Sequence, residues 1–323
     1  MPGRHPCSQS AMNWKLKAHV LAVLSRTPGG KGVYHALQHW LRTDRDPPEE
    51  YVSRTLEILQ MIGQQGRSAE KGTFLEIGTG WKPYLPFVLY LAGAERILTL
   101  DVNPWLRKSY IIKTYQALAP FLPRIAKQIG IEVDRLEERY RAGTPRGQSL
   151  AELLRACRVD YRCPADARQT GLPDGSVDFV VSSNVLEHIP EDVLRAMHRE
   201  SFRVLRPGGL AVHRFNPEDH FSGGDRSITR LNFLRFSQEE WHWYGGSGLA
   251  YHNRLRCRQH QRLFEEAGFL IRSSRVRIDQ RGLEAVRSGV LPVHPDFGGF
   301  TAEELAGDYM WLVAMRPPAA DVR

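Results

Sequence analysis

The sequence predicts an α/β fold in which helices cover both faces of a doubly wound, mostly parallel sheet of seven strands. Two observations lead to this prediction. From residue 72 onward, short apolar runs alternate with segments of helical periodicity, which is the pattern of repeated βαβ units. In addition, the 323 residues are 42 % hydrophobic and 25 % charged, the composition of an ordinary folded chain.

Seven apolar runs are the predicted strands: Thr73–Ile77, Arg96–Asp101, Val159–Cys163, Val177–Ser182, Gly209–Phe215, Phe269–Val276 and Tyr309–Arg316. Two connections, at about 104–157 and 216–260, exceed the length of a single crossover, so we interpret both as insertions. The first is expected to hold extra helices, and the second is rich in aromatic residues. The predicted organisation is a helical preface over 1–71, one domain over 72–316 that carries both insertions, and a tail over 317–323.

The preface is predicted to form two or three helices across residues 13–62, interrupted at Pro28-Gly29-Gly30. Its first helix would place Trp14, Ala18, Leu21 and either Val20 or Leu24 at helical spacing on one face. We expect this face to pack against the domain that follows. A less favoured alternative is that this basic, tryptophan-containing helix lies on a membrane surface.

The net charge of +8 raises the question of a nucleic-acid partner. The excess is spread over the chain, and one block, Arg226–Arg281, is locally rich in arginine. No RNA-binding module is recognisable in the sequence. We therefore expect no nucleic-acid partner. The oligomeric state does not follow from the sequence.

The expected location is a reducing cytoplasm. No apolar stretch approaches the roughly 20 residues that span a bilayer, and the start of the chain lacks the long apolar segment of a signal peptide. The four cysteines are Cys7, Cys157, Cys163 and Cys257. Their spacing is not that of metal ligands, so we expect no bound metal.

Polar residues lie at or just beyond the carboxyl ends of four predicted strands. The first strand contains Glu76 and turns through Gly78 and Gly80, where a ligand can approach the backbone closely. The second strand ends in Asp101, an acid placed to accept hydrogen bonds from ribose hydroxyls. Enzymes that use nicotinamide cofactors and those that use adenosylmethionine share these two features. Asp166-Ala167 come after the third strand, and Asn184 comes after the fourth.

These motifs resemble, in their order, the class I S-adenosylmethionine-dependent methyltransferases, in particular the group with a type 11 methyltransferase domain. The segments that carry the resemblance are Glu76–Gly80, Asp101, Asp166-Ala167, Leu172–Val181, Asn184–Ile189 and Val204–Gly209. It covers residues 72–216 strongly and 259–316 more loosely. Lys82 stands where many members of the group have a third glycine.

The resemblance implies a Rossmann-like fold and S-adenosyl-L-methionine as cofactor. It implies that Glu76, Gly78 and Gly80 surround the methionine portion and that Asp101 holds the ribose. Asp166 and Ala167 would meet the adenine, and Asn184 would lie beneath the sulfonium. The implied activity is methyl transfer to an oxygen or nitrogen of a small molecule, such as a sugar or another secondary metabolite.

A hydroxyl acceptor would benefit from a general base, for which histidine is suited. His220, in a polar loop beyond the fifth strand, is the first candidate, and His188 is the second. His213 lies within a strand and is expected to be packed.

The second insertion has two interpretations. Its aromatic residues would either line an acceptor pocket or form a small core, and Arg254, Arg256 and Arg258 would either bind an anionic acceptor or lie on the surface. For the whole chain, three alternative functions remain open: an RNA methyltransferase, a methyltransferase-like binding protein without turnover, and a nicotinamide oxidoreductase.

Overall fold

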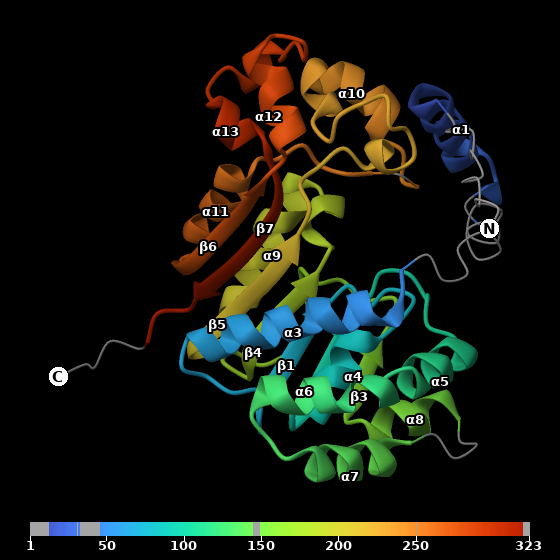
Figure 1. Ribbon diagram of the computed structural model, residues 1–323, viewed down its shortest axis with the longest axis vertical. Helices are drawn as coiled ribbons and strands as arrows, with labels where there is room; N and C mark the ends of the chain where they lie inside the picture. Colours follow the sequence, from blue (N-terminus) through green and yellow to red (C-terminus); the bar gives the residue numbers. More distant parts are fainter. Residues whose placement is uncertain (1–12, 31, 33–45, 145–148, 250, 319–323) are drawn as a thin grey trace, which may run out of the picture.

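The computed structural model describes residues 13–30, 32, 46–144, 149–249 and 251–318. Cys7, part of the predicted preface and residues 319–323 of the tail lie outside the described residues. Figure 1 shows a central sheet with a helical layer on each side and a further group of helices at one end.

The sheet has seven strands in the order β3-β2-β1-β4-β5-β7-β6. Strands β1 to β5 pair in parallel, and β7 lies antiparallel between β5 and β6. This topology confirms the predicted doubly wound, mostly parallel sheet. The strands are β1 (Thr73–Ile77), β2 (Arg96–Leu100), β3 (Val159–Arg162), β4 (Val177–Ser183), β5 (Leu205–Phe215), β6 (Leu270–Ile278) and β7 (Gly307–Met315).

Helices cover both faces because alternate strand side chains point to opposite sides and are apolar on each. One face packs against a layer that includes α3 (Pro48–Gln64) and α4 (Tyr84–Leu91). The other face packs against α9 (Glu191–Val204) and α11 (Cys257–Glu266). The long connection between β2 and β3 adds helices to the first layer: α5 (Lys108–Gln116), η1 (Ala119–Phe121), α6 (Leu122–Ile129), α7 (Val133–Gly143) and α8 (Leu150–Ala156).

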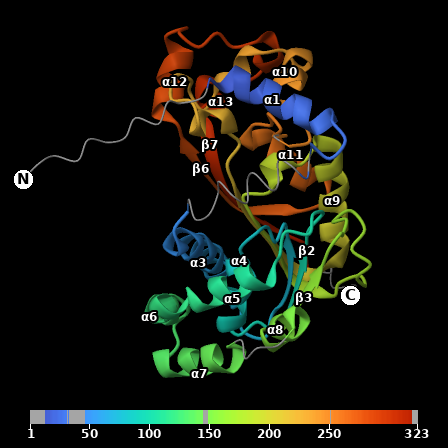
Figure 2. The ribbon, with the colours of Figure 1, turned by 90° about the vertical axis from the view of Figure 1, so that its right-hand side faces the viewer.

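A third apolar cluster joins the first helix to distant segments, and we call this group of elements the cap. Figure 2 shows α1 beside α10, in agreement with their contacts. Trp14 lies at its centre, with its ring centroid 5.0 Å from that of Tyr244 and 5.8 Å from that of Phe221. The cap comprises α1 (Trp14–Arg26), η3 (His220–Gly223), η4 (Asn232–Arg235), α10 (Gln238–Gly245), α12 (Gln280–Arg287), η5 (Pro295–Phe297) and α13 (Ala302–Leu305).

Aromatic residues of the second insertion take part in the core of the cap. Phe233 and Trp241 are buried with Trp14 in this small hydrophobic core. Trp241 also borders a pocket that Tyr251 lines, so both interpretations of the insertion describe part of it. The first helix packs through Trp14, Ala18 and Leu21, while its opposite face exposes residues that include Leu16. Among the described residues, no helix combines the length and apolarity needed to cross a bilayer.

Candidate active site

The predicted strand-end residues lie along one edge of the sheet. Because β3, β2, β1 and β4 are adjacent and parallel, their carboxyl ends meet there. Asp101 follows β2 directly and Asn184 follows β4 directly, while Glu76 is the penultimate residue of β1. Asp166 comes four residues after β3 ends. The topology therefore places these residues at the edge where ligands bind in open α/β sheets.

Asp101 connects the ends of β1 and β2. Its carboxylate accepts hydrogen bonds of 2.8 Å from the amide of Gly80 and 2.9 Å from the amide of Asn103. Burial raises the pKa of Asp101, and the hydrogen bonds from these two amides oppose that shift. Each carboxylate oxygen retains a further lone pair. The site therefore holds an oriented acceptor suited to hydroxyl groups.

Glu76 is a buried carboxyl group at the end of a short chain of two threonine hydroxyl groups. Thr99 donates a hydrogen bond of 2.5 Å to Glu76, and the Thr79 hydroxyl contacts that of Thr99. Burial raises the pKa of Glu76 to about 8, while the Thr99 hydrogen bond lowers it and the nearby Asp101 raises it further. A cationic ligand group here would favour the carboxylate form. This environment therefore fits the positively charged methionine portion of S-adenosylmethionine.

The turn after β1 brings the backbone close to the edge. Gly78 has φ +81°, and a Cβ atom there would lie 2.5 Å from Cγ2 of Val185. Gly80 has φ +67°, but a Cβ atom there would meet nothing within 4 Å. Gly78 is thus required by packing, whereas Gly80 leaves open space beside Asp101. This turn fits the close approach of a ligand to the backbone.

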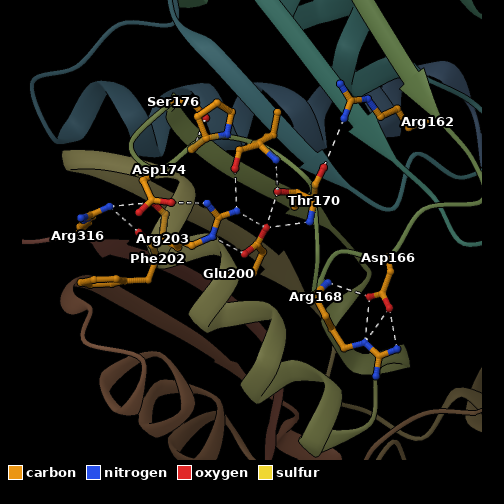
Figure 3. Close-up of polar contacts among 12 residues, drawn as sticks. Arg162, Asp166, Arg168, Thr170, Asp174, Ser176, Glu200, Phe202, Arg203 and Arg316 are labelled. Carbon is orange, nitrogen blue, oxygen red and sulfur yellow. Dashed lines mark hydrogen bonds and ion pairs between the residues drawn. The ribbon is translucent and has the colours of Figure 1, made fainter.

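The loop after β3 carries Asp166 and Ala167 to the same edge. The amide of Ala165 donates a hydrogen bond of 2.9 Å to the carbonyl oxygen of Asp101. The exposed Asp166 carboxylate turns to Arg168, which donates to both of its oxygens, as Figure 3 shows. Hydrogen bonds from Arg168 hold the pKa of Asp166 below its usual range. Contact between Asp166 and a ligand would therefore compete with Arg168.

A brace fixes the far end of this loop to α9 (Figure 3). Glu200 accepts hydrogen bonds from the amide of Thr170 at 2.8 Å and from its hydroxyl at 2.6 Å. Arg203 donates to Glu200 and to the carbonyl of Leu172. Hydrogen bonds from Arg203 and Thr170 lower the pKa of Glu200 to about 2. The brace limits the movement of the loop that carries Asp166.

Asn184 lies in a polar network that the sequence analysis missed. Its φ is +56°, and its Oδ1 accepts a hydrogen bond of 2.5 Å from the hydroxyl of Tyr309. Arg214 donates to the same oxygen at 3.5 Å and to Glu57 at 3.0 Å. Trp311 donates to Glu57 at 2.6 Å. A buried arginine in the apolar run of β5 was the one signal in the sequence that pointed to this network.

The two predicted histidine bases lie together, next to an acid that was not predicted. The rings of His188 and His220 are 4.7 Å apart between centroids. Glu187 lies beside them, buried. Burial raises the pKa of Glu187 to about 7 and lowers that of His220 well below 6.5.

His213 is packed within β5, as expected. Its Nδ1 lies 2.7 Å from the hydroxyl of Ser182, and the side chain is fully buried. Burial lowers its pKa to about 3, so the ring stays neutral in the folded protein at neutral pH. His213 therefore has no access to an acceptor.

Arg254 and Arg256 fit neither interpretation of the arginines in the second insertion, because both are buried and bonded within the protein. Arg256 is fully buried and donates to backbone carbonyls, and Arg254 donates to the carbonyls of Phe233 and Phe236. Arg258 pairs with Glu304. These guanidinium groups satisfy carbonyl and carboxylate oxygens of the protein itself. The sequence shows a run of positive charge but not these distant internal partners.

Residues 134–213 match the protein family described as "Methyltransferase domain". The chain is also similar to proteins named "uncharacterized methyltransferase". One, from Mycobacterium sp. (strain JLS), is 40% identical over 125 residues, which are 35% of this chain and 43% of the relative. Another, from Mycobacteroides abscessus, is 31% identical over 126 residues, or 39% of this chain and 40% of the relative.

Solved structures were also matched. A putative sarcosine dimethylglycine methyltransferase from Galdieria sulphuraria has a TM-score of 0.45 and 16% identity, over 82% of this chain and 86% of that one. An S-adenosylmethionine-dependent methyltransferase from Mesorhizobium loti has a TM-score of 0.43 and 18% identity, over 80% of this chain and 96% of that one.

Residues 134–213 are thus similar to a methyltransferase domain, and the sheet topology and the strand-end residues are those that the resemblance to class I S-adenosylmethionine-dependent methyltransferases implies. The resemblance stated from the sequence motifs is thereby confirmed. The chain spans less than half the length of the mycobacterial relatives described above.

Proposed function

We propose that this protein transfers the methyl group of S-adenosyl-L-methionine to an oxygen or nitrogen atom of a small molecule. The observation that carries the proposal is the meeting of Glu76, Asp101 and Asn184 at one sheet edge, beside the Gly78–Gly80 turn. When bound, the cofactor supplies an electrophilic methyl group on a sulfonium. The protein itself must bind the cofactor and the acceptor, align them and exclude water, because these effects supply much of the rate of such a displacement.

Each strand-end residue has a part in this proposal. Asp101 would accept the ribose hydroxyls, and the Gly80 and Asn103 amides hold its carboxylate in place. Glu76 would face the cationic methionine portion. Ala167 would meet the adenine, with Asp166 once it separates from Arg168. Asn184, held by Tyr309, would lie beneath the reacting centre.

A small acceptor is supported by the segment that returns from the cap over the edge of the sheet. The side chain of Asn253 donates to the carbonyls of Leu186 and Ile189 at 2.8 and 2.9 Å. The carbonyl of Tyr251 contacts His188 at 3.0 Å. The residues just beyond Asn184 are thus tied to the segment that follows α10. A covering segment held beside the sheet edge supports a small acceptor over a folded RNA.

Transfer of a labelled methyl group tests this function. The purified protein would be incubated with labelled S-adenosylmethionine and an extract of its source cells, and the products separated by ultrafiltration. We expect the label in the small-molecule fraction, and none with Asp101→Ala. Label in the RNA fraction alone would contradict the proposed acceptor class. Cofactor binding without any transfer would instead favour the binding-protein alternative.

A further inference from the structure

Three potential metal ligands converge beyond the ends of β4 and β5. Glu187 and His188 belong to η2 (Leu186–His188), which follows β4, and His220 begins η3, which follows β5. One ligand atom from each of the three side chains lies within 4.8 Å of the others. Two separate loops thus bring a carboxylate and two imidazoles to one place. This set of donors is typical of sites for divalent transition ions.

Glu187 is the independent sign that a ligand is missing from this cluster. Its side chain is fully buried, and among the described residues neither carboxylate oxygen makes a hydrogen bond of regular geometry, although the amides of Asn216 and of Glu187 itself lie nearby. Asp219, also fully buried, instead accepts hydrogen bonds from the Phe221 amide at 2.8 Å and the Asn232 side chain at 3.0 Å. Buried polar groups are normally satisfied, because leaving them without partners is costly. A cation between Glu187 and the histidines would satisfy it.

The histidines are oriented as metal ligands usually are. Nδ1 of His188 lies 3.0 Å from the carbonyl oxygen of Tyr251, so this nitrogen carries the proton and Nε2 keeps its lone pair. Nε2 of His220 faces the carbonyl oxygen of Asn216 at 3.4 Å, which leaves the lone pair on Nδ1. Ligating histidines commonly donate their other N–H to a backbone carbonyl in this way. Each ring therefore has one nitrogen available for a metal.

We propose that Glu187, His188 and His220 bind one divalent first-row transition ion, such as Zn²⁺ or Mn²⁺. Metal–ligand bonds of about 2.0–2.2 Å require that the ligand atoms lie no more than about 4 Å apart. Side-chain rotations that move each ligand atom by less than about 1 Å would bring the three atoms to this spacing. Two imidazole nitrogens favour these ions over Ca²⁺ and Mg²⁺, which prefer oxygen ligands. His188 is exposed, so the ion enters from solvent and keeps an open coordination position.

The position of the ion gives it a role that rests on the proposed function. Glu187 comes three residues after Asn184, which places the proposed ion near the sheet edge, where an acceptor hydroxyl would take the open coordination position. The ion would lower the pKa of that hydroxyl. Its proton leaves to water, its oxygen gains the methyl carbon, and the carbon–sulfur bond breaks with its electron pair on sulfur. This role replaces the general-base role expected of His220 from the sequence.

Cobalt provides a direct test, because Co²⁺ bound by nitrogen and oxygen ligands absorbs visible light. Full-length protein stripped with a chelator would be titrated with Co²⁺, and then with Zn²⁺ in competition. We expect one ion per chain and at least tenfold weaker binding in Glu187→Gln, His188→Gln and His220→Gln. The exposed position of His188 makes its variant the one expected to fold normally. His242→Gln, which changes an exposed histidine of α10, is the matched control and should bind Co²⁺ as the wild type does.

Lack of Co²⁺ and Zn²⁺ binding by the wild type would overturn the proposal, as would unchanged affinity in both His188→Gln and Glu187→Gln. These readouts need no cofactor and no acceptor. If the wild type binds Co²⁺, the variants do not, and no methyl transfer is found, the metal site is supported and the proposed function is contradicted. If the wild type transfers methyl groups but binds no ion, the proposed function is supported and the metal site is contradicted.

Discussion

The backbone amide of Gly80 donates a hydrogen bond of 2.8 Å to Oδ2 of Asp101. This bond joins the turn after β1 to the end of β2, so the backbone position that a ligand would approach and the carboxylate that would bind it are fixed relative to each other. Preorganisation of this kind lowers the entropic cost of binding.

Asp101→Ala should lower S-adenosylmethionine affinity by at least about tenfold. Hydrogen bonds to a charged acceptor contribute about 1.5–3 kcal/mol each, and about 1.4 kcal/mol corresponds to a factor of ten in affinity. Isothermal calorimetry measures the change, and thermal unfolding checks that the variant is folded. Asp134→Ala, at an exposed position on α7, is the control. Equal affinity in the wild type and Asp101→Ala would show that the ribose assignment is wrong.

Gly80→Ala should weaken cofactor binding, because its added methyl group would occupy space beside Asp101. This loss of affinity is separate from the loss of stability caused by backbone strain. Its matched control is Gly130→Ala, since Gly130 has φ +72° against +67° at Gly80 and neither Cβ would meet an atom within 4 Å. Both variants should lose about 1–2 kcal/mol of stability from the left-handed backbone. Only Gly80→Ala should lose affinity. Similar affinities in the two variants would argue against a ligand beside Gly80.

Acid should destabilise the protein partly through His260. The ring is fully buried, neither nitrogen has a hydrogen-bond partner among the described residues, and burial lowers its pKa to about 3. As pH falls below 6.5, the unfolded chain binds this proton while the folded protein does so only near pH 3. Stability is therefore lost across this window, by up to about 1.4 kcal/mol per pH unit from one group.

The variant His260→Phe isolates this contribution, because phenylalanine keeps an apolar ring and removes the titrating group. Urea unfolding is measured at several pH values between 3 and 6.5. These measurements give the slope of the free energy of unfolding against pH. We expect a shallower slope in the variant than in the wild type. The same slope in both proteins would exclude His260 as a source of acid sensitivity.

Arg256→Met should destabilise the fold by about 3 kcal/mol without changing S-adenosylmethionine affinity. The variant leaves buried acceptors unsatisfied, each at a cost of about 1–3 kcal/mol. Arg258→Met, which breaks an exposed ion pair with Glu304, should cost less than about 1 kcal/mol. Urea unfolding measures both. A stable Arg256→Met variant would contradict the structural role of this guanidinium, whose acceptors are the carbonyls of Arg254, Leu305, Gly307 and Pro217.

The sheet was predictable because its signals are local. Each strand is a short apolar run, and the structure has a strand at all seven predicted places. The position of Asp101 at the sheet edge followed from the same pattern, since a residue that ends a parallel strand must lie at the carboxyl edge. For such residues, sequence position alone fixes the place in the fold.

Contacts between distant residues were not predictable in this way. Tyr309 bonds Asn184 across 125 residues of sequence, and Trp14 is buried by rings that follow β5. Arg256 appeared as part of a charged block, although it is buried among carbonyl groups. In each case the partner depends on how the cap folds back, and no local periodicity records that.

Calorimetric titration of the wild-type protein with S-adenosyl-L-methionine, and separately with NAD, tests the central claim most directly. That claim is that the edge formed by Glu76, Asp101 and Asn184 binds S-adenosylmethionine. We expect saturable binding of one S-adenosylmethionine per chain and no heat of binding with NAD. Binding of NAD, or no binding of S-adenosylmethionine by folded protein, would contradict it.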